Sequence, residues 1–97
     1  MAETSATPLP PICDLNAAAP LKDALLAALK GDGPLLVDVS AVRQFGTPCA
    51  QVLLSADRSA LQRRSDSGLR LTGASAAFTD AMQDLGLDDA LERWSER

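Results

Sequence analysis

The sequence predicts an α/β fold in which helices pack against a short mixed β-sheet. Short aliphatic runs alternate along the chain with longer segments whose apolar residues recur at helical spacing. The resulting order, strand and helix in turn with a second helix at the end, is typical of an α/β layer with right-handed crossovers. A length of 97 residues, of which 46% are hydrophobic and 23% charged, fits one globular domain.

The N-terminal part is expected to contain a tail, a short strand and a helix. Residues 1–8 are small and polar, which predicts a flexible tail ahead of a single domain at 9–97. Prolines limit the next β-forming residues to a short edge strand at 11–14. An amphipathic helix then follows, with Asn16 as its N-cap and Gly31 as its C-terminal stop. Its apolar face consists of Ala18, Leu21, Leu25, Ala28 and Leu29.

The middle of the chain is expected to supply the central strand and a second helix. Residues 34–40 form an aliphatic run after a turn, which predicts a strand in the middle of the sheet. After a loop at 41–46, a helix is predicted over 48–64, with Thr47 as N-cap and Pro48 in the first helical position. Its apolar face consists of Val52, Leu53, Ala56, Ala60 and Leu61.

The C-terminal part is expected to add a strand and two helices. A short strand is predicted at 69–72, followed by a helix at 75–85 that Gly86 ends. The last residues are predicted to form a short helix. Apolar residues in register on these two helices are Phe78, Met82 and Leu85, then Leu87, Leu91 and Trp94.

Composition excludes several classes of function. The chain has no histidine, which removes the usual general base and the usual zinc ligand. Two distant cysteines, Cys13 and Cys49, cannot fill a metal site and are expected to be buried free thiols. A net charge of −4 disfavours binding to nucleic acid. We therefore expect no enzymatic activity, no metal or other cofactor, no membrane insertion and a cytoplasmic location, since the first residues carry no export signal.

Three local patterns are better explained by structure than by chemistry. Asp38 ends a strand as the phosphoacceptor of a response regulator does, but both lysines precede it, so we expect its carboxylate to accept a hydrogen bond from nearby backbone. The glycine-rich stretch at 31–34 precedes a strand and lacks the P-loop lysine, so it is a turn. The arginines at 58, 63 and 64 complement a helix C-terminus and solvate its outer face.

One segment, DVSAVRQFGTPCAQVLL, combines a strand, a short loop and a hydroxyl residue at a helix N-terminus. It resembles the STAS domain family, the fold of the anti-sigma factor antagonists. In that family an aspartate or asparagine and seven variable residues precede Asp-Ser-Ser-Gly or Asp-Thr-Ala-Gly. Counting from Asp38 places Gly46, Thr47, Pro48 and Cys49 on those four positions. The stretches DLNAAAPLKDALLAAL and FTDAMQDLGLDDAL resemble the family's first and late helices, so the resemblance spans nearly the whole chain.

This resemblance implies a small STAS-like regulatory domain that docks reversibly onto a partner protein, with Thr47 as the phosphorylation site. The partner it implies is a histidine-kinase-like anti-sigma factor or another signalling protein. Whether the protein also forms a homodimer is left open by the resemblance. Alternatives are a cytoplasmic STAS subunit of a lipid-transport ABC system, an accessory protein of chemotaxis signalling, or, from another class, a flavodoxin-like nucleotide-binding module or enzyme. The partner-binding residues it implies are Ser40, Phe45, Gly46, Thr47, Pro48 and Gln51.

Overall fold

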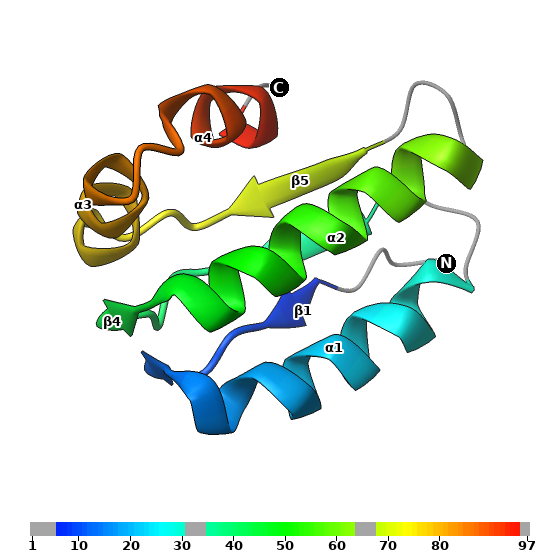
Figure 1. Ribbon diagram of the computed structural model, residues 1–97, viewed down its shortest axis with the longest axis horizontal. Coiled ribbons are helices and arrows are strands. Elements are labelled where there is room, and N and C mark those ends of the chain that lie inside the picture. The colour runs from blue at the N-terminus through cyan, green and yellow to red at the C-terminus, as the bar shows by residue number, and fades with distance from the viewer. Residues whose placement is uncertain (1–5, 31–34, 64–67, 96–97) are drawn as a thin grey trace.

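The computed structural model describes residues 6–30, 35–63 and 68–95. Strands and helices follow one another in the order shown in Figure 1. The elements are β1 (Thr7–Pro8), β2 (Ile12–Cys13), α1 (Leu15–Leu29), β3 (Leu35–Asp38), β4 (Gln44–Phe45), α2 (Thr47–Arg63), β5 (Leu69–Thr72), α3 (Ala76–Asp84) and α4 (Asp88–Ser95).

The strands form two small sheets in which every pairing is parallel. The larger sheet has the order β1-β3-β5, and the smaller one pairs β2 with β4. The predicted α/β fold, with helices packed against a short sheet, is confirmed. The described strands are parallel and not mixed, because each pair of partners is separated in the chain by a helix, and such crossovers return the chain in the same direction. The prediction that the aliphatic run forms the central strand is confirmed, since β3 lies between β1 and β5.

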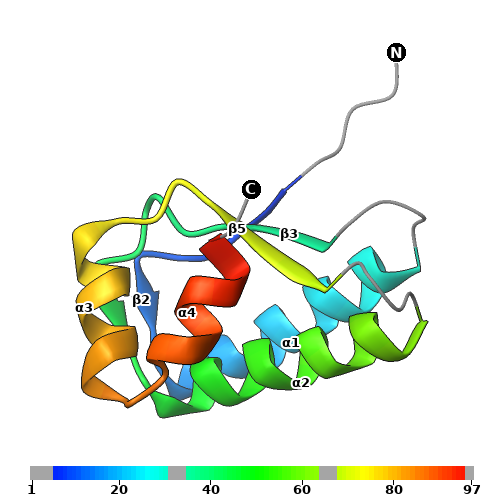
Figure 2. The ribbon, with the colours of Figure 1, turned by 90° about the horizontal axis from the view of Figure 1, so that it is seen from above.

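The three-stranded sheet carries its core on one face. Its register pairs Leu35 with Leu69 and Val37 with Leu71. Of these four side chains, Leu71 is half-buried and the others are buried. Leu36 and Arg70, which lie between them, point to the other side, where Leu36 is half-buried and Arg70 is exposed. Helices α1 and α2 cover the apolar face, side by side, while α4 lies along β5 (Figures 1 and 2).

The domain begins earlier than the sequence indicates. Thr7 and Pro8 pair with Val37 and Asp38, so these two residues of the expected tail belong to the sheet. The amide of the next residue, Leu9, donates to the Asp38 carbonyl at 2.9 Å, and its side chain is buried. Residues 1–5 of the expected tail lie outside the described residues. A two-residue strand that contains proline has no local signal, because a partner strand supplies its stabilisation.

Helix α1 also begins earlier than expected. Its N-cap is Asp14, whose carboxylate accepts from the amide of Ala17 at 3.3 Å, so the assignment of Asn16 as cap is wrong. Pro20 consequently lies past the first turn, inside the helix. Its ring nitrogen cannot donate to the carbonyl of Asn16, but that residue is exposed, so water can satisfy the carbonyl. The predicted stop at Gly31 lies outside the described residues, as do the other residues of the 31–34 turn.

The apolar faces predicted for the helices are largely confirmed. Three leucines of α1 are buried, and Leu53 of α2 and Trp94 of α4 are fully enclosed. The exceptions are Leu61 and Leu85, whose side chains are 39% and 37% exposed at the ends of their helices. Buried residues of the core cluster include Leu21, Leu25, Leu29, Leu35, Val37, Val39, Leu53, Ala60, Leu69, Phe78, Met82 and Trp94.

Candidate functional site

The start of α2 is hydrogen-bonded to the two-stranded sheet. The amide of Gly46 donates to the carbonyl of Cys13 at 3.0 Å, which ties the residue before the helix to β2. The amide of Ala50 then donates to the carbonyl of Gly46 at 3.1 Å, and this is the first hydrogen bond of the helix. The thiol of Cys49 donates to the carbonyl of Asp14 at 3.4 Å, linking the same turn to the cap of α1. The helix N-terminus is thereby fixed against two other elements.

Phe45 anchors this region from within the core. Its side chain is 8% exposed, and its ring packs edge-to-face on Phe78 of α3 with centroids 4.8 Å apart. A side chain in this position cannot contact a partner in the described conformation, so the inclusion of Phe45 among surface residues is corrected. The strand β4 that carries it was expected to be loop, because only its pairing with β2 defines it. All three aromatic residues of the chain, Phe45, Phe78 and Trp94, are buried in the core.

The four remaining residues around the helix start form a continuous stretch of surface. Thr47 and Gln51 are exposed and lie four residues apart, so they share one face of α2. Gly46 and Pro48 are half-buried beside them. We call the residues Gly46, Thr47, Pro48 and Gln51 the α2 N-terminal surface.

Thr47 does not cap α2, contrary to expectation. Because the carbonyl of Gly46 accepts the first helical hydrogen bond, Gly46 occupies the cap position and Thr47 is the first residue of the helix. Pro48 then follows in the second position, where its missing amide hydrogen costs no helical bond. The Thr47 hydroxyl is therefore exposed at the positive end of the helix macrodipole and is not needed for capping.

Ser40 lies on the loop after β3, apart in sequence from the helix start. Its amide donates to the Asp38 carboxylate at 2.9 Å, and this hydrogen bond holds the pKa of Asp38 below its ordinary value. The expectation that Asp38 serves a local turn is confirmed. Gly73, after β5, packs against this turn with a positive φ of 69°. A Cβ there would lie 2.8 Å from the Cβ of Ser40, so the two loops are closely fitted.

The two cysteines are free and buried, as expected. Burial, followed by the effect of neighbouring Cys49, raises the pKa of the Cys13 thiol to about 12. Burial is also the main cause that raises the pKa of Cys49. Both thiols therefore stay protonated at neutral pH and are poor nucleophiles. Among the described residues, no group of three or more histidine, cysteine or acidic side chains could hold a metal ion.

An ion pair between a buried carboxylate and an exposed arginine was not predicted from the sequence. Asp57 is 5% exposed, accepts from the amide of Leu69 at 3.0 Å and pairs with Arg93 at 3.2 Å. It joins α2, β5 and α4. The sequence offered one signal for this ion pair: Asp57 lies between Leu53 and Ala60, two residues predicted for the apolar face of the helix. Of the arginines on this helix, Arg58 is exposed, whereas Arg64 lies outside the described residues.

The structure is a small α/β domain in which β2, the Cys49 thiol and the Phe45–Phe78 pair fix the start of α2. A family model described as "Mlab, STAS domain" matches residues 12–93. The chain belongs to the STAS domain family, whose members are generally binding and regulatory modules. Searches of curated proteins and of solved structures gave no match. Among the described helices, none is both long enough and apolar enough to cross a membrane.

Proposed function

We propose that this STAS domain is a regulatory module without enzymatic activity, which binds a partner protein reversibly through the α2 N-terminal surface. The observation that carries the proposal is that Thr47 is exposed on a helix start whose backbone is hydrogen-bonded to β2. A surface fixed in this way loses little conformational entropy when a partner docks, which favours binding. The protonated thiols beneath it support a binding role over a catalytic one.

Phosphorylation of Thr47 would switch this interaction without refolding. A phosphate adds about −1.5 to −2 charges and three acceptor oxygens. The helix N-terminus accommodates negative charge, whereas a partner already docked over Thr47 would meet both the charge and the bulk. Because the hydroxyl does not cap the helix, its modification removes no bond that holds α2 in place.

The partner we favour is a histidine-kinase-like anti-sigma factor, as in the proteins that the Thr47 segment resembles. The ATPase subunit of a lipid-transport ABC system and a chemotaxis signalling protein are the alternatives. A flavodoxin-like nucleotide-binding role is the competitor from another class. It predicts a rise in melting temperature on addition of free nucleotides, which a docking module does not show.

The test combines purified partners of these classes with hydrogen exchange. Binding of the true partner should slow exchange at the amides of residues 46, 47 and 49–51 and leave those of α4 unchanged. Incubation with the kinase-like partner and ATP, followed by mass spectrometry, should place one phosphate on Thr47. Protection confined to α3 or α4, with residues 46–51 unchanged, would contradict the proposed surface.

A further inference from the structure

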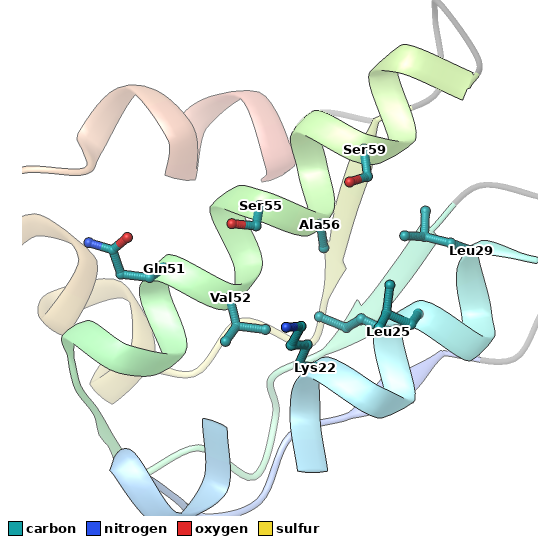
Figure 3. A pocket seen from close by; sticks show the side chains of 9 residues that line it. Lys22, Leu25, Leu29, Gln51, Val52, Ser55, Ala56 and Ser59 are labelled. Atoms are coloured by element: carbon teal, nitrogen blue, oxygen red, sulfur yellow. The ribbon is translucent and has the colours of Figure 1, made fainter. Parts of the chain in front are cut away.

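A groove runs between α1 and α2, beside the α2 N-terminal surface (Figure 3). Its volume is about 320 Å³, within the range of small-molecule sites. Aliphatic side chains supply most of the floor and one wall, and polar side chains of α2 edge the other wall. The lining residues are Lys22, Leu25, Leu26 and Leu29 from α1 and Gln51, Val52, Ser55, Ala56 and Ser59 from α2.

The apolar part of the groove is only partly enclosed by the protein itself. Leu25 and Leu29 are nearly fully buried, but Leu26 on the rim is 49% exposed. Val52 of α2 is half-buried opposite them. A ligand that covered Leu26 and the exposed part of Val52 would remove apolar surface from water, which is favourable in proportion to the area covered.

The groove has one positive end. Lys22 is its sole charged lining residue, and among the described residues it takes part in no salt bridge. Figures 1 and 2 show that α1 and α2 run in the same direction, so their N-termini lie at the same end. Lys22 and Gln51 are the lining residues nearest those N-termini, whereas Leu29 and Ser59 lie at the opposite end (Figure 3). The positive charge of Lys22 therefore lies at the end of the groove nearer to both helix N-termini.

No carboxylate lines the groove to oppose this charge. Asp14 caps α1 and Asp23 follows Lys22, but neither side chain contributes to the lining. Asp57 is on the opposite side of α2, where it pairs with Arg93. Negative charge is thus favoured at the Lys22 end of the groove, where it meets a cation and no carboxylate of the lining.

We propose that the groove between α1 and α2 binds a free, single-chain amphiphile with one negative charge, its head group at Lys22 and its chain against Leu26 and Val52, in the direction of Leu29. The helical rise places Lys22 and Leu29 about 10 Å apart along the axis, which suits a medium-length alkyl chain. The site is separate from the proposed role of Thr47 and does not depend on it, although Gln51 borders both.

Octanoate is the probe, and backbone amide shifts in NMR spectra of the full chain are the readout. Saturable shifts are expected at residues 22–29 and 51–59. Octyltrimethylammonium, which has the same chain and the opposite charge, should give none. Lys22→Glu should weaken octanoate binding about three- to tenfold, because one attraction is replaced by a repulsion of similar size. Lys30→Glu makes the same charge change outside the groove and should leave the affinity unchanged.

A second matched pair tests the apolar wall. Leu26→Glu should abolish saturable binding, since its carboxylate stands on the wall four residues from Lys22 and competes for the ammonium. Leu15→Glu, on the same helix and 72% exposed, should bind like the parent. Circular dichroism verifies that all four variants fold.

Three results would overturn the proposal. Octanoate shifts could be absent or lie elsewhere, or octyltrimethylammonium could bind equally well. The two lysine variants could lose affinity equally, which would indicate a general charge effect. Finally, sedimentation could show a dimer of the parent that Leu26→Glu dissociates, in which case a second copy of the chain covers the groove.

Discussion

Replacing Asp57 with alanine should destabilise the domain by an amount that follows from its two hydrogen bonds. The carboxylate accepts from the Leu69 amide at 3.0 Å and from the Arg93 guanidinium at 3.2 Å. Loss of the first leaves a buried backbone donor unsatisfied, which costs about 1–3 kcal/mol. Loss of the second costs about 0.2–1 kcal/mol, because the Arg93 side chain is 56% exposed and water screens the pair. The expected total is about 1–4 kcal/mol.

Two companion variants separate these contributions. Arg93→Ala removes only the ion pair and should cost about 0.2–1 kcal/mol. Asp57→Asn keeps an acceptor for the Leu69 amide and should lie between the parent and Asp57→Ala. The free energy of unfolding is measured by urea denaturation for each. If Asp57→Ala unfolds within about 0.5 kcal/mol of the parent, the carboxylate does not join α2 to β5 and α4 as argued.

Three further predictions concern the core, one glycine and one thiol. Leu53→Ala should lower the free energy of unfolding, measured by urea denaturation, by about 2–5 kcal/mol, because the side chain is fully buried. Leu15→Ala, at an exposed position, should lower it by less than about 0.5 kcal/mol, and equal losses for the two variants would contradict the assigned core. Gly73→Ala should lower the melting temperature more than Gly86→Ala, because both glycines have a positive φ but only a Cβ at residue 73 would lie 2.8 Å from another residue. Equal effects would show that the loops around Ser40 and Gly73 are not closely fitted. The folded pKa of Cys13 is raised from 9.0 to about 12, so its thiol stabilises the fold below pH 9.0 and that contribution is lost as the pH rises towards 12. The free energy of unfolding of the parent should therefore fall between pH 9.0 and about 12, and that of Cys13→Ala should fall less steeply over the same range.

Sequence patterns predicted the elements that local chemistry defines. Helix α2, the aliphatic run of β3 and the strand β5 lie where they were expected, and α1 does so apart from its first two residues, because each buries its own apolar side chains on one face. Ser75 caps α3 at the start of the range predicted for that helix. The STAS family, inferred from the segment that contains Thr47, is confirmed by the family match.

The parts that sequence could not predict depend on partners distant in the chain. Strands β1 and β4 have two residues each and exist through pairing with β3 and β2. Asp14 and Asn16 are equally good caps by residue type, and only the position where the chain leaves β2 decides between them. Phe45 was assigned to a surface by its nearness in sequence to Thr47, but the contact with Phe78 turns its ring inward.

Thr47→Glu tests the central claim, that a partner docks on the α2 N-terminal surface and that negative charge there prevents docking. The substituted residue is the first of α2 and not its cap, so the added charge should leave stability unchanged or raise it by about 0.3–1 kcal/mol. Ser95→Glu adds the same charge at an exposed position on α4 and serves as the control. Calorimetric titration with the partner should give no detectable binding for Thr47→Glu and parental affinity for Ser95→Glu and Thr47→Ala. Binding of Thr47→Glu with the affinity of the parent would show that the surface around Thr47 is not the interface.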